Sequence, residues 1–218
     1  MINKSLSITL VVDNPKSWMN DFIPTLIKSL TSLGHNVNFI QNLSDLKKGD
    51  IAFFLSCEKI VSAALLSKHT HNLVVHESAL PKGKGWSPLT WQVLEGKNKI
   101  PISLFEASVK VDSGDIYFTD FIELDGTELV SNLRKKQAQK TFDLILRFVS
   151  NYPKTVSLKQ SGYETFYKKR SPSDSQLDVN KTIAEQFNLL RVVDNERYPA
   201  FFIHKGRKYI IKIYDGES

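Results

Sequence analysis

Two side chains that can move protons follow apolar segments of the chain, 36 residues apart. His76 ends the run Leu73-Val74-Val75, and Asp112 comes shortly after the apolar segment 102–109. A histidine changes its charge near neutral pH, so it can both accept and donate a proton. A carboxylate within reach favours the imidazolium form and can orient the ring or a water molecule. Taken singly, a packed histidine and a turn-forming aspartate are the simpler interpretations.

The apolar runs around these residues predict alternating strands and helices. Strands are expected over residues 6–12, 37–40, 51–55, 73–76, 102–109 and 116–124, and helices over 22–33, 60–66, 88–96 and from 127 to just before Pro153. Strands that are apolar on both faces and alternate with helices indicate an α/β fold, a mainly parallel sheet with helices on both faces. In such sheets ligands bind beyond the carboxyl ends of the strands, and His76 lies at one of these ends.

A second, smaller part follows the main domain. We assign residues 1–153 to the main domain and 154–218 to a small C-terminal α+β extension packed on it. Residues 154–175 are polar and are interpreted as an excursion over the surface. A helix around 181–190 follows, then a hairpin whose turn is Lys205-Gly206-Arg207. A piece of this size needs the main domain to be stable.

Composition bounds the class of protein. With 41% hydrophobic and 24% charged residues, the chain is an ordinary globular protein. No apolar run approaches the roughly 18 residues of a membrane helix, and the start lacks a secretory pattern. The lone Cys57 excludes an internal disulfide and fits a reducing compartment, so we expect a cytoplasmic protein with no membrane partner.

The net charge of +6 suits phosphate-bearing ligands. The basic residues are not clustered in one segment, as they usually are in a nucleic-acid binder. The densest basic runs are Arg134-Lys135-Lys136 and Lys168-Lys169-Arg170. The first run falls within a helical pattern and is interpreted as a solvated face. A nucleic-acid partner is therefore not expected from charge alone.

The segment after His76 resembles a motif of the folate-dependent formyltransferases, which include glycinamide ribonucleotide, methionyl-tRNA and nucleotide-sugar enzymes. That family carries Asn-x-His-x-Ser-x-Leu-Pro, a glycine and a proline at fixed offsets, and then Asp-x-Gly. The resemblance covers residues 5–150 and continues weakly into the extension. It implies a Rossmann-like catalytic domain that uses 10-formyltetrahydrofolate and no metal. The residues that match in order and spacing are His76, Ser78, Leu80, Pro81, Gly85, Pro88, Asp112 and Gly114.

The resemblance assigns His76 as general acid and base, and Asp112 as its electrostatic partner. An amine that attacks the formyl carbon must lose a proton, and the folate nitrogen must leave with one, so one histidine can mediate both transfers. Family analogy also places the donor's pterin slot among apolar residues that are equally explained as core. The predicted donor-site residues are Phe54, Leu55, Ser56, Ile60, Ala107, Val109, Val111 and Asp115.

The glycine-rich segment just after the histidine motif is the candidate acceptor site. Its flexible glycines, two lysines and a tryptophan could hold a diphosphate and a flat base or sugar face. The alternative interpretation is a basic surface loop. The predicted acceptor contacts are Ser78, Lys82, Gly83, Lys84, Gly85 and Trp86.

One position departs from the family motif. Where the family has asparagine, this chain has Val74. The asparagine is expected to donate a hydrogen bond to the developing oxyanion, a contribution of roughly 3–4 kcal/mol in other enzymes. Valine has no donor. Asn72, about 7 Å away along a regular strand, or a backbone N–H group is a candidate replacement; a slow enzyme and an inactive homologue are the alternatives.

The resemblance is strongest to the nucleotide-sugar branch. The glycine-rich phosphate loop of the glycinamide ribonucleotide enzymes is replaced by residues 11–15, and the 65 residues after position 153 are too few for the β-barrel of methionyl-tRNA enzymes. Segment 74–91 looks most like the branch that formylates a UDP-linked 4-amino-4,6-dideoxy sugar on the way to a formylated pseudaminic acid. It is also similar to the formylation domain of linear gramicidin synthetase.

The expected acceptor is therefore the amine of a nucleotide-linked amino sugar. Two alternatives stay open: formylation of an aminoacyl group on tRNA or a carrier domain, and a folate-binding homologue without catalysis. The oligomeric state, the sugar and the nucleotide do not follow from the sequence.

Overall fold

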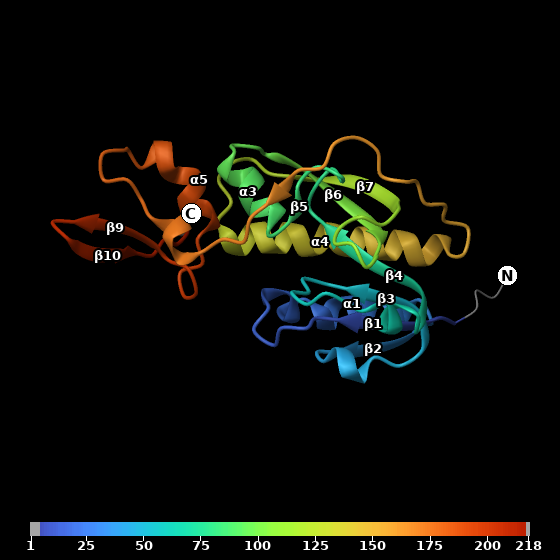
Figure 1. Cartoon of the computed structure of the whole chain (residues 1–218). Helices are drawn as coiled ribbons and strands as arrows, with labels where there is room; N and C mark the ends of the chain where they lie inside the picture. The colour runs from blue at the N-terminus through green and yellow to red at the C-terminus, as the bar shows by residue number, and fades with distance from the viewer. Residues whose placement is uncertain (1–4, 217–218) are drawn as a thin grey trace.

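A six-stranded sheet forms the centre of the computed structural model, which describes residues 5–216, so the first four and last two residues of the predicted parts lie outside it. The strand order is β2-β1-β3-β4-β6-β7. Strands β1 to β4 run parallel, β6 is antiparallel to β4, and β7 is antiparallel to β6. The predicted α/β fold with a mainly parallel sheet is confirmed (Figure 1). The strands are β1 Ser7–Val11, β2 Asn36–Ile40, β3 Gly49–Phe54, β4 His69–His76, β6 Lys99–Glu106 and β7 Ile116–Glu123.

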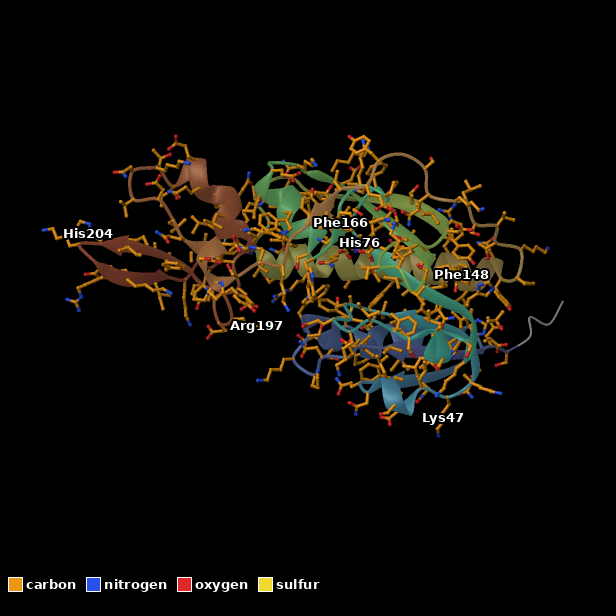
Figure 2. The ribbon with its side chains drawn as sticks, viewed as in Figure 1. Lys47, His76, Phe148, Phe166, Arg197 and His204 are labelled. Carbon is orange, nitrogen blue, oxygen red and sulfur yellow. The ribbon has the colours of Figure 1, made fainter. Side chains whose placement is uncertain are left out.

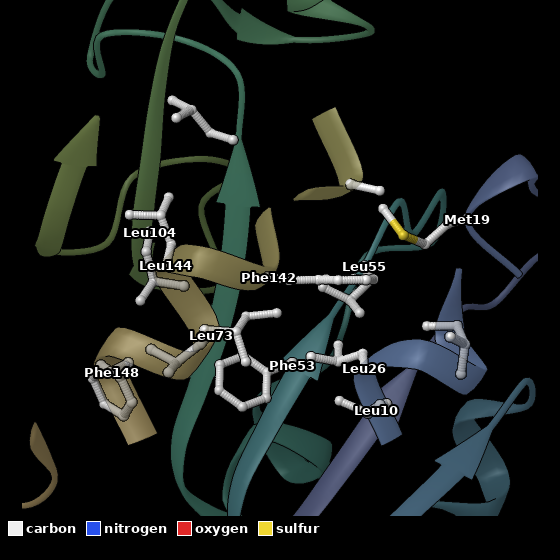
Figure 3. Packing of buried hydrophobic residues seen from close by; sticks show 14 of the residues in the cluster. Leu10, Met19, Leu26, Phe53, Leu55, Leu73, Leu104, Phe142, Leu144 and Phe148 are labelled. Carbon is white, nitrogen blue, oxygen red and sulfur yellow. The ribbon is translucent and has the colours of Figure 1, made fainter. Parts of the chain in front are cut away.

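Two helices cover one face of the sheet. α1 (Ile23–Ser32) connects β1 to β2, and α4 (Val130–Asn151) follows β7. Their apolar residues recur every three or four positions, so each helix presents one stripe to the strands. Figure 3 shows α4 packed on the sheet, and the rings of Phe53 and Phe148 meet edge to face with centroids 6.5 Å apart. This layer contains the largest cluster of buried side chains.

The other face has a lighter cover. α2 (Ala63–Leu66) and a short 3-10 segment, Leu43–Asp45, pack there on a smaller apolar cluster. The helix predicted over 60–66 is only four residues long. The residues before it are held as a loop, because the N–H groups of Glu58 and Lys59 donate to the carboxylate of Asp13. Within residues 5–216, no helix combines the length and the hydropathy that a membrane span requires.

The segment after α4 does more than cross the surface. It runs back over the main domain (orange in Figure 1), and its short strand β8 (Phe166–Tyr167) pairs in parallel with β5 (Lys84–Gly85). The helix predicted at 181–190 is instead a 3-10 turn followed by α5 (Phe187–Val192), and the predicted hairpin is present. The remaining elements are α3 Pro88–Leu94, β9 Ala200–His204, β10 Arg207–Ile211, and 3-10 turns at Trp18–Asp21, Pro172–Ser175 and Ala184–Gln186.

Ion pairs help to hold the extension to the main domain, among them two made by arginines. Arg191 of α5 is 1% exposed, and its Nη2 lies 2.9 Å from Oε2 of Glu128. Its Nε also donates to the Glu128 carbonyl at 3.1 Å. Because a buried charge without a partner is costly, this pair fixes where α5 can dock. Closer to the sheet ends, Arg134 of α4 pairs with Asp194 at 2.8 Å.

Candidate active site

His76 is the last residue of β4, and its ring lies between two loops. Nε2 is 2.9 Å from the Gly83 carbonyl oxygen and 3.7 Å from Oδ2 of Asp112. Because a carbonyl oxygen only accepts, Nε2–H donates to Gly83, and Nδ1 is the nitrogen left to accept a proton. The side chains of His76 and Asp112 are 9% and 12% exposed, so water screens their attraction only in part.

Asp112 lies in the loop between β6 and β7 and has a left-handed backbone, with φ of 50°. Aspartate adopts this conformation more readily than most residues. Its Oδ2 accepts from the N–H of Gly85 at 2.9 Å. Two residues further on, a Cβ at Gly114 would lie 1.7 Å from the Glu106 carbonyl oxygen. The Asp-x-Gly spacing is therefore imposed by the packing of this loop against β6.

A cavity of about 590 Å³ opens beside His76 and Asp112. Its volume is within the range of pockets for drug-sized ligands. Its lining includes apolar residues at the ends of β3 and β4 and in the loop after β6, which we call the apolar half. It also includes basic residues, among them Arg197 of the extension, which we call the basic half. Figure 2 shows His76 in the middle of the molecule and His204 at the tip of the hairpin, far from the cavity.

Most of the predicted donor-site residues line this cavity. Val109 does not; it is 66% exposed. Asp115 does not line it either, because its carbonyl accepts from the Glu106 N–H and extends the pairing of β6 with β7. The lining contains Phe54, Leu55, Ser56, Ile60, Ala107 and Val111.

Of the predicted acceptor contacts, Gly85 and Trp86 line the cavity and the two lysines do not. The Lys84 ammonium is 1% exposed and donates to Ser113 Oγ at 2.7 Å and to Glu164 Oε1 at 2.8 Å. The Lys82 ammonium lies 4.3 Å from the centre of the Tyr163 ring. Both ammonium groups contact other side chains of the protein. Their placement therefore does not support a direct role in acceptor binding.

The other two predicted acceptor contacts, Ser78 and Gly83, lie behind His76. The Ser78 carbonyl accepts from Ser103 Oγ at 2.8 Å. Gly83 has φ of 72°, and a Cβ there would meet the side chain of Ser78 at 3.0 Å. These residues shape the loop that supports the histidine ring, and neither lines the cavity.

The basic residues that line the cavity are not among the site residues predicted from the sequence. Arg134 was interpreted as part of a solvated face, but α4 turns it toward the cavity, where it pairs with Asp194. The run at 168–170 was noticed only as charge. Its proximity to His76 depends on the path of the segment after α4, which no local pattern revealed. The basic lining residues are Lys59, Arg134, Lys169, Arg170 and Arg197.

Val74 lines the cavity where the family asparagine would be. Asn72 does not line it, and its Nδ2 donates to the Leu66 carbonyl at 2.8 Å. The amide of Asn72 is thus occupied below the cavity. Of the two replacement donors considered from the sequence, a backbone N–H group is the one that this arrangement leaves.

Cys57 and Glu77 also line the cavity. Burial raises the pKa of the Cys57 thiol to about 12, and the charge of Asp13 adds to the effect. A thiol at neutral pH is a poor nucleophile, which agrees with a structural role for Cys57. Burial also raises the pKa of the Glu77 carboxyl, next to His76 in the chain.

Known proteins are similar to this chain both in sequence and in fold. The model of a family described as formyl transferase matches residues 22–149, more than half of the chain. The methionyl-tRNA formyltransferase of Malacoplasma penetrans is 24% identical over 236 residues, covering 100% of this chain and 73% of the relative. A methionyl-tRNA relative is notable because the sequence pointed to the nucleotide-sugar branch.

Two solved structures share the fold. HypX from Aquifex aeolicus, in complex with tetrahydrofolic acid, matches with a TM-score of 0.82 at 14% identity, covering 96% of this chain and 38% of that one. A sugar N-formyltransferase from a Shewanella species matches with a TM-score of 0.69 at 15% identity, covering 98% and 99%.

Proposed function

The chain belongs to the formyl transferase family, and we propose that it moves a formyl group from 10-formyltetrahydrofolate to the primary amine of a nucleotide-linked amino sugar. The observation that carries this proposal is a cavity whose lining contains the apolar half, the basic half, and the pair His76 and Asp112. A donor with a flat ring would bind the apolar half, and an acceptor with phosphates would bind the basic half. Their reacting atoms would then meet at the histidine.

The apolar half fits the pterin ring of the donor. Phe54, Leu55, Val74, Ala107 and Val111 give it a surface of apolar side chains, with few polar groups to desolvate. When bound, the donor supplies the formyl carbon that the amine attacks. That a tetrahydrofolate complex shares this fold supports the choice of donor.

His76 is the proposed proton carrier. Its Nδ1 takes the proton that the attacking amine must lose, since Nε2–H is already committed to the Gly83 carbonyl. The Asp112 carboxylate, 3.7 Å from Nε2, stabilises the imidazolium that forms. His76 then returns the proton to the departing nitrogen, so each cycle restores the neutral ring. General acid–base help of this kind is typically worth roughly 10²–10⁴-fold in rate.

The basic half suits a diphosphate. Two of its five cations have carboxylate partners, Arg134 with Asp194 at 2.8 Å and Lys169 with Glu58 at 3.8 Å. The half therefore keeps a positive surplus for an anionic ligand. The Lys169 ammonium lies 4.1 Å from the centre of the Trp86 ring, which is 36% exposed and could stack on a base.

The methionyl-tRNA relatives favour a second candidate acceptor, an aminoacyl group on tRNA. It offers the same amine and phosphate chemistry on a much larger body. The sugar nucleotide remains our proposal because the basic residues line the same cavity as His76 and Asp112.

Incubation with 10-formyltetrahydrofolate and a panel of acceptors tests the proposal. The panel contains UDP- and dTDP-linked amino sugars, methionyl-tRNA and an aminoacyl carrier domain, read by mass spectrometry for the gain of a formyl group. We expect the gain on a sugar nucleotide, with release of tetrahydrofolate that depends on the amine. A gain on tRNA or carrier alone would refute the sugar acceptor, and no transfer to any amine would indicate a non-catalytic folate-binding homologue.

A further inference from the structure

The segment that leaves α4 lies across both loops that carry the reacting residues. We call residues 156–171 the strap; it is the orange segment that passes β7 and β5 in Figure 1. It starts alongside β7, where the backbone N–H groups of Ile116 and Leu158 each donate to the other's carbonyl at 2.8 Å. From there it reaches first the aspartate loop and then the histidine loop.

The strap holds the histidine loop by its backbone. The N–H groups of Lys84 and Trp86 donate to the carbonyls of Thr165 and Tyr167, at 2.9 and 3.1 Å. The N–H of Gly83 donates to Thr165 Oγ1 at 2.8 Å. Gly83 is also the residue whose carbonyl holds the histidine ring. The position of that carbonyl therefore depends on the strap.

The strap also explains a glycine of the family motif. Gly85 has φ of 96°, and a Cβ there would lie 2.5 Å from the Tyr167 carbonyl oxygen. A side chain at this position would push the strap away from the histidine loop. The glycine is thus required by close approach of the strap, whereas the sequence suggested a ligand contact.

One strap side chain bridges two backbone carbonyls of the aspartate loop. The amide of Gln160 donates to the carbonyls of Asp112 and Gly114, at 2.9 and 2.8 Å. Both bonds fall on the turn in which Asp112 adopts its left-handed backbone. They therefore fix the direction in which the aspartate side chain leaves the chain.

A buried ammonium group joins all three segments. Lys84 belongs to the histidine loop, and its Nζ donates to Ser113 of the aspartate loop and to Glu164 of the strap. With the Lys84 side chain 1% exposed, loss of either partner would leave a poorly compensated charge. Lys110 reaches the same Glu164 oxygen from the surface at 2.9 Å.

From these contacts we infer that Lys84, Gln160 and Glu164 are positioning residues that hold His76 and Asp112 at their working separation. None of the three lines the cavity, so they act on the reacting pair through the loops. A misplacement of about 1 Å can cost roughly 10²-fold in rate. The strap is therefore part of the catalytic apparatus even though it lies outside the main domain.

Two strap variants test this inference by kinetics. In Gln160→Leu and Glu164→Ala we expect kcat to fall roughly tenfold or more while KM for donor and acceptor stays within about twofold. Glu164→Gln keeps an acceptor oxygen and should retain more turnover than Glu164→Ala. The matched control is Lys159→Ala, which removes an exposed strap side chain and should behave as wild type. A normal kcat in the first two variants, or a change in KM alone, would overturn the inference.

The kinetic arm rests on the proposed formyl transfer, so a second arm uses hydrogen exchange. In both variants we expect faster exchange at residues 83–86 and 113–116, with β1 to β3 unchanged. Unchanged or uniformly faster exchange would overturn the inference. If wild-type protein transferred no formyl group but showed this local loosening, the proposed function would fail and the positioning role would stand.

Discussion

The apolar and basic halves of the cavity are built by the chain in different ways. The apolar half comes from strand ends and loops between residues 54 and 111, all within one sheet. Most of the basic half comes from Arg134 on α4 and from three residues beyond position 153. Most of the first half is placed by the sheet, whereas most of the second depends on how the strap and the extension dock.

If the basic half binds the acceptor, as we propose, this difference separates acceptor specificity from donor binding. A change in the extension beyond the strap, for example at Arg197, can alter the basic half while His76, Asp112 and the apolar half stay in place. The ion pair between Arg134 and Asp194 marks the junction, because it ties a cavity-lining residue of α4 to the extension. A family that shares one donor can in this way present different acceptor sites.

Removing His76 or Asp112 should have the largest effect. We expect His76→Ala and Asp112→Ala each to lower kcat by roughly 10²–10⁴-fold, because both proton transfers lose their carrier or its partner. Donor binding should persist, since the apolar half is intact. Steady-state kinetics, with folding checked by thermal melting, measures this, and His204→Ala at the hairpin tip is the control. Near wild-type turnover in either folded variant would show that the centre lies elsewhere.

Variants of the basic half should alter acceptor binding alone. We expect Trp86→Ala and Lys169→Ala each to raise KM for the sugar nucleotide about tenfold, or about 1.4 kcal/mol, while KM for the folate stays nearly constant. Lys168→Ala is the matched control, because that neighbouring ammonium pairs with Asp174 at 3.0 Å and does not line the cavity. Equal changes in both KM values would mean that the two halves are not separate sites.

Val74 tests whether the apolar half already holds an oxyanion donor. If a backbone N–H group fills that role, Val74→Asn adds a polar group that must be desolvated, so kcat should stay unchanged or fall. If instead the site lacks an oxyanion donor, Val74→Asn should supply one and raise kcat tenfold or more, which lowers the barrier by about 1.4 kcal/mol. Steady-state kinetics of this one variant decides, with thermal melting to confirm the fold.

The smallest effect concerns the stability of the sheet beneath both halves. Burial lowers the pKa of His69, with the Asp50 charge opposing and the Lys68 charge adding to the effect. The unfolded chain then binds a proton more readily, so stability should fall as pH drops below about 6.5, by at most about 1.4 kcal/mol per pH unit.

Denaturant unfolding of His69→Gln at pH 7.5 and 5.5 checks this expectation. The variant should lose less stability on acidification than wild type, whatever its stability at pH 7.5. Burial also lowers the pKa of His35, so His35→Gln shows how much of the slope comes from a second histidine. If the slope is the same in wild type and in His69→Gln, the assignment to His69 is wrong.

The fold could be predicted because its signals are local, whereas the roles of His76 and Asp112 were assigned by their match to the family motif and stay a prediction. Each strand is a short apolar run, and His76 stands at the end of one, so its place at the edge of the sheet follows from chain direction alone. Placement of the lysines does not follow in this way. Lys84 meets Glu164, which is 80 positions away in sequence. A lysine between glycines has the same local pattern whether it faces a ligand or a buried carboxylate.

The basic half was missed for the same reason. Arg134 sits in a charged helical stretch whose face is decided by the docking of α4, and its partner Asp194 lies 60 positions away. Lys169 and Arg170 reach the cavity because of the strap, whose polar sequence has no apolar period to mark it. Contacts between polar segments that are far apart in sequence produce no periodic pattern of apolar residues from which they could be predicted.

The strap also sets an order of events during synthesis. Chains emerge from the ribosome N-terminus first, at roughly 5–20 residues per second, and domains generally fold as units. The sheet and α4 can assemble once residues up to 151 are available. The N–H groups of the histidine loop still lack partners at that stage, because Thr165 and Tyr167 have yet to emerge. We therefore expect the nascent chain to fold its sheet first. It should become catalytically active only after its last quarter has been synthesised.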